Sequence, residues 1–268
     1  MKKQFVLLAL APMCVAAFAS CSKADEKTKV LVFAAASLEE SLNALKASYE
    51  SEHSDVEIQL NLASSGDLQT QIKNGAEFDM FFSASTAQTN TLTTEGFLNA
   101  DSRVDLLKNE LCLVTPKGNA RGVTSFDYLC EHIYDEGFIF CCGAIEGQKT
   151  VPAGKYTKTA LQAKGVDLAA AATAGHVDYR DSVKKVLSAV KDAAGACGTV
   201  YYSDYWSARN DVDFIEKIPD SLTGPIIYPL AMAEASKDKE AAKGFYDYLK
   251  TATAKTAFEN CKFVWNIE

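Results

Sequence analysis

VLVFAAASLEE, residues Val30–Glu40, is the stretch that decides the fold. Val30–Phe33 is a short run of β-branched and aromatic residues, which is typical of a buried parallel strand. Three alanines follow it, and apolar side chains then recur at helical spacing in SLEESLNALKASYE, which predicts a helix that begins at Ser37. A strand is therefore expected to run into a helix through a turn of very small side chains.

Ser37 lies at the start of that helix. With Glu40 it forms the pattern S-x-x-E, from which we expect a capping box at the helix N-terminus. A helix N-terminus presents unpaired N–H groups and partial positive charge, and here a hydroxyl stands beside them in a space that alanines keep open. These features suit a small anion, although a single serine of this kind is more often a plain N-cap.

The same arrangement recurs at three more places, and this recurrence favours the anion site. The alternating strand Val56–Leu62 leads through ASSGD into a helix, which places Ser65 at a second strand-to-helix turn. Ala153 follows a proline, a residue that suits the first turn of a helix. Ser182 is a natural N-cap, so Val183 opens a helix with apolar residues at i, i+3, i+4 and i+7.

Strands and helices alternate with short loops along the whole chain, which predicts parallel sheets covered by helices on both faces. Further strands are expected over Phe78–Ser83, Leu111–Val114, Phe138–Cys142, Gly198–Tyr202 and, at a sheet edge, Asp213–Lys217. Ile226–Ala233 is extended and apolar, but its Pro229 argues against a central, fully paired strand.

Two extended segments, near Leu111–Lys117 and Ile226–Ala233, bracket the middle third of the chain. The chain is therefore expected to leave one lobe, build a second and return. Residues 30–112 and 227–268 are assigned to lobe I and residues 113–226 to lobe II. The predicted fold class is α/β, with two lobes joined by a two-segment hinge and a ligand cleft between them.

The N-terminus has the layout of an export signal. Two lysines precede an apolar run that is too short to span a bilayer comfortably, and small residues then lead into Cys21. Residues 18–21, FASC, resemble a bacterial lipoprotein signal, so we expect cleavage after residue 20, a lipidated Cys21 and a polar tether over residues 21–29. An ordinary signal peptide cut nearby is the alternative. The mature protein is expected outside the cytoplasm, anchored to a membrane through its lipid.

The composition argues against nucleic acid as a partner and against a metal site built from cysteine and histidine. The formal net charge is −8 and no basic stripe is interleaved with aromatic residues, so nucleic acid is an improbable partner. An acidic chain that binds an anion must use local dipoles and not its overall field. Six cysteines follow Cys21, which permits disulfides of unknown connectivity in an exported chain, but no CxxC pair or cysteine–histidine metal spacing is present.

Seven motifs in order resemble the periplasmic molybdate-binding protein of molybdate ABC transporters, across essentially the whole chain after the tether. They are VFAAASL at Val32–Leu38, ASSGDLQTQI at Ala63–Ile72, FDMFFSAS, VPAGKY at Val151–Tyr156, DSVKKVLSAV, GTVYYSD and AKGFYDYLKT. The resemblance implies two α/β lobes that close over a tetrahedral oxyanion, molybdate or tungstate. It also implies a monomer that delivers the anion to an ABC permease and its ATPase subunit, with no enzymatic activity and no cofactor.

The resemblance assigns the ligand contacts to uncharged hydrogen-bond donors. Ser37 and Ser65 each provide a backbone N–H and a hydroxyl, Ala153 and Val183 provide backbone N–H groups, and Tyr201 provides its phenol. Molybdenum is bound only within the oxyanion, through these same residues. For the fourth contact, Val177 in HVDY is a rival that would need an insertion in the match.

Four alternatives remain open, and one of them, a purely structural surface lipoprotein, would not need four ligand-like helix starts. Another oxyanion, sulfate or phosphate, is the runner-up, and phosphate would want an acidic side chain to accept its proton. Ferric ion would suit the adjacent Tyr201 and Tyr202 as hard oxygen ligands. An enzyme with Ser37 or Ser65 as nucleophile would need a base within reach, and no such arrangement is found in the sequence.

Overall fold

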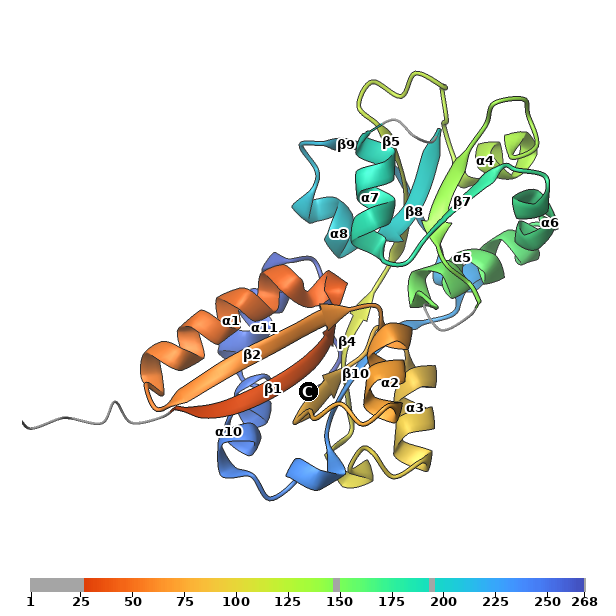
Figure 1. Ribbon diagram of the computed structural model, residues 1–268. Coiled ribbons are helices and arrows are strands. Elements are labelled where there is room, and N and C mark those ends of the chain that lie inside the picture. Colours follow the sequence, from red (N-terminus) through yellow and green to blue (C-terminus); the bar gives the residue numbers. More distant parts are fainter. Residues whose placement is uncertain (1–26, 147–149, 193–195, 268) are drawn as a thin grey trace, which may run out of the picture.

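The computed structural model describes residues 27–146, 150–192 and 196–267, and it consists of two α/β lobes (Figure 1). Lobe I is built on a six-stranded sheet of order β11-β4-β10-β3-β1-β2. Lobe II is built on a five-stranded sheet of order β7-β6-β8-β5-β9. The two-lobed α/β fold class that the sequence predicts is therefore confirmed, but the expectation of parallel sheets is wrong. Both sheets are mixed, because β10 and β11 in lobe I and β5 in lobe II run antiparallel to their neighbours. The expected signal peptide and Cys21 lie outside the described residues.

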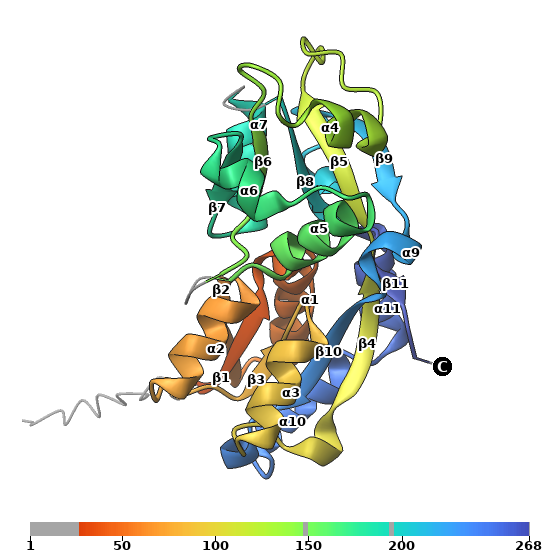
Figure 2. The same cartoon turned by 90° about the vertical axis from the view of Figure 1, so that its right-hand side faces the viewer.

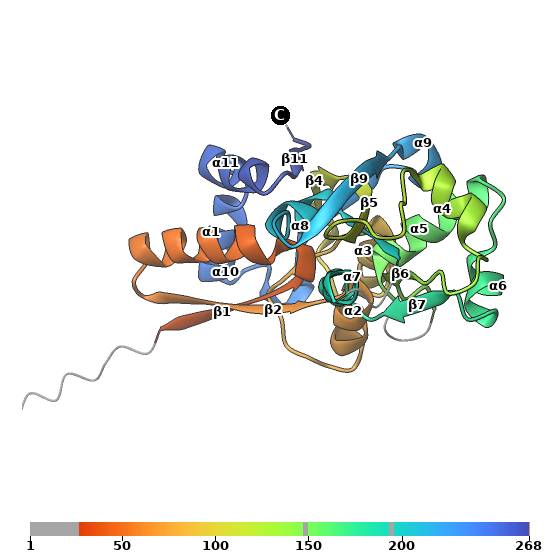
Figure 3. The same ribbon diagram turned by 90° about the horizontal axis from the view of Figure 1, so that it is seen from above.

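Lobe I takes its elements from both ends of the chain. Its strands are β1 (Thr28–Ala35), β2 (Val56–Ala63), β3 (Met80–Phe82), β4 (Val104–Asn109), β10 (Ile226–Met232) and β11 (Val264–Trp265). Its helices are η1 (Ala36–Leu38), α1 (Glu39–Glu52), α2 (Ser65–Lys73), α3 (Thr86–Thr94), η2 (Ala100–Ser102), η3 (Glu234–Ser236), α10 (Glu240–Tyr248) and α11 (Ala252–Asn260). Helices α1, α10 and α11 cover one face of the sheet, and α2 and α3 cover the other (Figures 1 and 3).

The alternation of side chains along β1 explains this two-sided packing. Val32 and Ala34 belong to the main core, together with the buried leucines of α1, whereas Phe33 turns to the opposite face and joins Leu68 and Ile72 of α2. A strand buried on both faces reads as a continuous apolar run, which is why Val30–Phe33 shows no polar residue.

Lobe II is formed by the middle of the chain. Its strands are β5 (Leu111–Pro116), β6 (Phe140–Gly143), β7 (Val177–Arg180), β8 (Cys197–Tyr201) and β9 (Val212–Ile218). Its helices are α4 (Phe126–His132), α5 (Pro152–Ala163), α6 (Leu168–Thr173), α7 (Val183–Lys191), α8 (Tyr202–Ser207) and α9 (Asp220–Thr223). The chain passes between the lobes where β4 continues into β5 and again between β9 and β10 (Figure 2).

Two expectations about local structure are wrong. Strand β10 is central, between β3 and β4, although Pro229 argued against this position. The register with β4 shifts between Tyr228 and Pro229, and this irregularity accommodates the missing N–H of the proline. The strand expected to continue through Tyr202 ends at Tyr201 instead, and helix α8 begins at Tyr202.

The cysteines that follow Cys21 lie in the described part of the chain, and all of them are free thiols. They are Cys112, Cys130, Cys141, Cys142, Cys197 and Cys261. Cys112, Cys141, Cys142 and Cys197 are fully buried in lobe II, where they act as small core residues. Among the described residues, no helix is both long and apolar enough to cross a membrane.

Candidate functional site

A small cavity lies between the lobes, where strand-to-helix turns of both lobes meet. It is lined by Ala35, Ala36, Ser37, Ala63, Ser64, Ser65, Ala84, Val151, Pro152, Ser182, Val183 and Tyr201. The cavity is small, and the volume open to the centre of a water molecule is about 10 Å³. None of the lining side chains carries a charge. The cavity therefore offers hydroxyl and backbone groups to a single small occupant.

Ser37 reaches the cavity from a turn that differs from the expected one. It lies in the 3₁₀ turn η1, and α1 starts only at Glu39, without a side-chain cap. The predicted capping box is therefore wrong. The Ser37 hydroxyl lies 2.9 Å from the hydroxyl of Tyr228 on β10, and Glu40 instead accepts a hydrogen bond from Ser207 in lobe II. The Ser37 hydroxyl thus bonds to Tyr228 of another strand and does not cap the N-terminus of α1.

Ser65 is the first residue of α2, and its neighbour Ser64 is the N-cap, whose hydroxyl accepts from the N–H of Asp67. The Ser65 side chain is fully buried, and its Oγ accepts a hydrogen bond of 2.9 Å from the N–H of Ala84. Because a backbone N–H can only donate, the hydrogen of the Ser65 hydroxyl remains available for another acceptor. The hydroxyl therefore faces the cavity as a donor.

Lobe II contributes two helix N-termini. Helix α7 begins at Val183, and the Ser182 hydroxyl caps it by accepting from the N–H of Lys185. Helix α5 begins at Pro152 with Val151 as N-cap, and both of these residues line the cavity. Ala153 is fully buried in the first turn of α5 but is not itself a lining residue.

Val177, the rival of Val183, lies within strand β7, where it pairs with Phe140 in the lobe II sheet. It is not among the residues that line the cavity. Of the two candidates, only Val183 lies at a helix start that faces the gap between the lobes.

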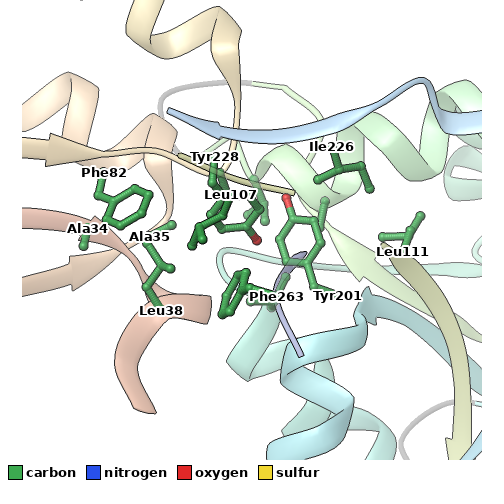
Figure 4. Close-up of a cluster of buried hydrophobic side chains, with 14 of the residues drawn as sticks. Ala34, Ala35, Leu38, Phe82, Leu107, Leu111, Tyr201, Ile226, Tyr228 and Phe263 are labelled. Carbon is green, nitrogen blue, oxygen red and sulfur yellow. The ribbon is translucent and has the colours of Figure 1, made fainter. Parts of the chain in front are cut away.

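Tyr201 is the last residue of β8 and is 1% exposed. Its hydroxyl is fully buried and makes no direct hydrogen bond among the described residues, although the Tyr228 hydroxyl is close enough to contribute to its raised pKa. The rings of Tyr201 and Tyr228 pack edge to face with centroids 5.6 Å apart, so the two lobes meet at this pair (Figure 4). Burial raises the pKa of Tyr201 well above its ordinary value, and its phenol therefore keeps its proton. A buried hydroxyl without a partner is the clearest sign of a missing acceptor.

Tyr202 has a different environment from Tyr201. Its ring packs against Tyr205 and Phe214, and Nζ of Lys217 lies 4.0 Å from its centroid. It is not a lining residue of the cavity. The two tyrosines therefore do not present their phenols to one site, as a ferric centre would require.

Contacts at the rim hold the lobes together. Lys184 at the start of α7 forms an ion pair of 3.0 Å with Glu39 of α1. Nζ of Lys262 in lobe I lies 4.2 Å from the ring centroid of Trp206 on α8. Together with the hydrogen bond from Ser207 to Glu40, these contacts join lobe I to lobe II, so the two lobes are closed on each other.

The chemistry of the site is that of an anion receptor. Its donors are backbone N–H groups at helix starts and hydroxyl groups, which suit oxygen atoms that bear negative charge. No group of three or more histidine, cysteine, aspartate or glutamate side chains could hold a metal ion within the described residues.

Sequence reasoning missed two polar residues behind the site, Asn109 and Tyr228. Both are buried, at 2% and 0% exposure, and their side chains are 3.3 Å apart. The sequence pattern singles out neither of them, because Asn109 ends the strand VDLLKN, which already carries Asp105 and Lys108, and Tyr228 is an aromatic residue within the apolar run IIYPLAM.

Comparisons with known proteins agree with this geometry. A family model described as "Bacterial extracellular solute-binding protein" matches residues 30–261. The chain is 32% identical over 249 residues to the "Putative ABC transporter substrate-binding lipoprotein YvgL" of Bacillus subtilis (strain 168), which covers 91% of this chain and 89% of that protein. It is 30% identical over 250 residues to the "Molybdate-binding protein ModA" of Escherichia coli (strain K12), with 92% and 93% covered.

The fold has a similar counterpart among solved structures. The periplasmic molybdate-binding protein of Azotobacter vinelandii superposes with a TM-score of 0.73 at 19% sequence identity, covering 90% of this chain and 100% of that one. At this level of identity the likeness concerns the fold alone.

Proposed function

The chain belongs to the family of bacterial extracellular solute-binding proteins, and we propose that it captures molybdate between its lobes and delivers it to an ABC importer. The family consists of exported binding proteins and not of enzymes. The relative from Escherichia coli is named a molybdate-binding protein, and 92% of this chain aligns with it. Tungstate, which has nearly the same size and charge, is the second expected ligand.

The observation that carries the proposal is the buried Tyr201 hydroxyl, which lacks a partner among the described residues and belongs to a cavity lined only by uncharged groups. Such a hydroxyl is costly unless an acceptor joins it. An oxyanion supplies acceptors and nothing else, and it would complete the hydrogen bonding of Tyr201. It would also accept a hydrogen bond from the Ser65 hydroxyl, whose Oγ already accepts one from the N–H of Ala84.

Neutral donors are sufficient for tight binding. The six donors of the lining residues Ser37, Ser65, Val183 and Tyr201, at roughly 1.5–3 kcal/mol each, amount to about 9–18 kcal/mol before dehydration of the dianion is subtracted. Micromolar to nanomolar affinity needs only about 8–12 kcal/mol net. The site therefore needs no lysine or arginine.

The other ligand classes fit less well. Phosphate carries a proton that needs an acceptor, and no carboxylate lines the cavity. Ferric ion would want both phenols of Tyr201 and Tyr202, but Tyr202 packs into a different cluster. Sulfate has the right charge and is smaller, so it is expected to bind more weakly in a cavity whose donors are held by two sheets.

Calorimetric titration of the pure protein with molybdate, tungstate, sulfate, phosphate and ferric citrate tests the proposal. We expect tight binding of molybdate and tungstate only. Equal affinity for sulfate in a competition titration, or a coloured iron complex, would overturn the assignment.

We also propose that the mature protein is a monomeric lipoprotein without a cofactor, tethered through Cys21. The support is the FASC segment and the relative from Bacillus subtilis, which is named a lipoprotein. In a bacterial host, the protein should partition into detergent and Cys21→Ser should abolish this behaviour. An acyl-free N-terminus found by mass spectrometry of the mature wild type would refute the anchor.

A further inference from the structure

Lys262 lies in the turn that ends α11, and its backbone has a conformation that side chains with a Cβ rarely adopt. Its φ is +67°, and among the described residues other than glycine only Asn119 also has a positive φ. The turn is a Schellman motif, because the N–H of Lys262 bonds to the carbonyl of Glu259 and the N–H of Phe263 bonds to that of Phe258. Glycine is the usual residue at this position, since it has no Cβ to clash.

Other helices of the protein follow this rule. Helices α2, α3, α5 and α6 each have a glycine of positive φ directly after the C-cap residue, and these are Gly75, Gly96, Gly165 and Gly175. A lysine at the same position of α11 carries a conformational cost that glycine would avoid. At Asn119 the local structure compensates, because its side chain accepts from the N–H of Val123 at 2.9 Å and donates to the carbonyl of Val123 at 2.8 Å.

The contact that Lys262 gains from this turn crosses from lobe I to lobe II. Its Nζ lies 4.2 Å from the ring centroid of Trp206 on α8, and no salt bridge or hydrogen bond joins this Nζ to another described residue. Cζ of Arg209 lies 4.6 Å from the same centroid, and Arg209 also donates to the carbonyl oxygen of Trp206, so lobe II itself holds the ring in place. Lys262 and Trp206 are both partly buried, which strengthens a cation–π contact.

We propose that Lys262 is a latch between the lobes, whose strained turn places the ammonium group on Trp206 and thereby slows release of the bound oxyanion. This inference rests on the proposed function. Because the contact joins the two lobes, it forms only when they are closed, and its free energy is added to the affinity for a ligand that closes them. The backbone strain is present in the open and the closed protein alike. Retention of the ligand and stability of the fold are therefore opposed at this residue.

The substitution Lys262→Gly tests this opposition. Glycine relieves the positive φ and removes the ammonium group, so urea denaturation of the ligand-free protein should give an unchanged or higher free energy of unfolding. In calorimetry, the dissociation constant for molybdate should rise by about 2- to 5-fold, the range for one cation–π contact of partly exposed groups. The rate at which labelled molybdate leaves the protein in an excess of unlabelled anion should increase by a similar factor.

Two further substitutions at the same position separate the charge from the backbone. Lys262→Met keeps the Cβ and the length of the side chain, so it should weaken molybdate binding as Lys262→Gly does, without a gain in stability. Lys262→Arg keeps the cation and should bind like wild type. In a Trp206→Leu background, none of the three substitutions should change the dissociation constant, because the ring that Lys262 contacts is gone.

Lys250→Met is the matched control. Nζ of Lys250 lies 4.0 Å from the ring centroid of Tyr246, and both residues belong to lobe I. The substitution therefore removes the same charge and the same kind of contact, but it does not affect a contact between the lobes. The dissociation constant and the release rate of molybdate should stay as in wild type. An equal loss of affinity in Lys250→Met and Lys262→Met would show that net charge alone acts on the anion, and it would overturn the latch.

The remaining outcomes separate the latch from the proposed function. Unchanged molybdate binding in Lys262→Gly would overturn the latch and leave the proposed function intact. A loss of affinity that persists in the Trp206→Leu background, or a lower free energy of unfolding in Lys262→Gly, would do the same. Wild-type protein that binds no oxyanion would overturn the proposed function and this inference with it.

Discussion

Replacing Tyr201 by phenylalanine should weaken molybdate binding and leave the free energy of unfolding unchanged or slightly higher. The substitution removes a single oxygen and keeps the ring that packs against Tyr228. In the ligand-free protein this oxygen has no hydrogen-bond partner within the described residues, so its removal breaks no bond. In the complex, the same oxygen is the donor that lobe II contributes through β8.

The magnitudes follow from these two environments. A hydrogen bond to a charged acceptor contributes about 1.5–3 kcal/mol, which corresponds to a loss of roughly ten- to 150-fold in molybdate affinity. Removal of an unpartnered buried hydroxyl should leave the free energy of unfolding unchanged or raise it by up to about 1 kcal/mol. An ordinary buried tyrosine would instead lose stability, as expected for Tyr246→Phe, whose hydroxyl donates to a backbone carbonyl.

The assay pairs calorimetric titration with urea denaturation of ligand-free protein. Tyr202→Phe serves as the matched neighbour, because its ring packs on Tyr205 and Phe214 outside the cavity, and it should bind molybdate like wild type. The reasoning is refuted if Tyr201→Phe binds molybdate as wild type does. It is equally refuted if the loss of affinity is accompanied by a comparable loss of stability, since Tyr201 would then act through the fold.

Three further substitutions test other parts of the site. Ser65→Ala leaves the N–H of Ala84 without its acceptor, so urea denaturation should show a loss of about 1–3 kcal/mol, with weaker molybdate binding in calorimetry. Gly66→Ala should disturb the closed arrangement, because a Cβ there would lie 2.4 Å from the carbonyl oxygen of Thr150 in lobe II; we expect at least tenfold weaker molybdate binding and a lower free energy of unfolding. Asp204 is buried without a partner among the described residues, and burial raises its pKa from 3.8 to about 7. The folded protein therefore keeps a proton that the unfolded chain releases, and wild-type stability should fall as pH rises through this window, by at most about 1.4 kcal/mol per pH unit. Asp204→Asn should show a flatter profile, and an unchanged profile would exclude this carboxyl as the cause.

The parts of the fold that the sequence predicts are those that local pattern controls. The run Val30–Phe33 is apolar on both faces because β1 has helices on both sides, and this signal needs no knowledge of its partners. Ser182 caps α7 as expected, because an N-cap is decided within three residues. Ser37, Ser65 and Val183 each follow the carboxyl end of a strand and Tyr201 ends one, so all four reach the cavity from the carboxyl ends of strands in the two sheets.

The errors occur where a distant residue outweighs a local preference. Ser37 has the pattern of a capping box, but Tyr228 is 191 positions away in the sequence and takes its hydroxyl. Pro229 disfavours a central strand by its own chemistry, yet a register shift beside it lets β10 pair on both sides. Neither partner can be identified from spacing along the chain, because each depends on which strands become neighbours in the sheet.

An acidic protein can bind an anion at this site because the carboxyl groups near the cavity are either paired or largely uncharged. Glu39 is paired with Lys184, and Glu40 accepts a hydrogen bond from Ser207, so the charges of α1 at the rim have partners across the lobes. Asp204, three residues after Tyr201, is buried, and its raised pKa of about 7 keeps much of its population uncharged near neutral pH. A dianion in the cavity therefore meets partial positive charge from helix starts and hydroxyls, while exposed carboxylates, which contribute to the net charge of −8, are screened by solvent and salt.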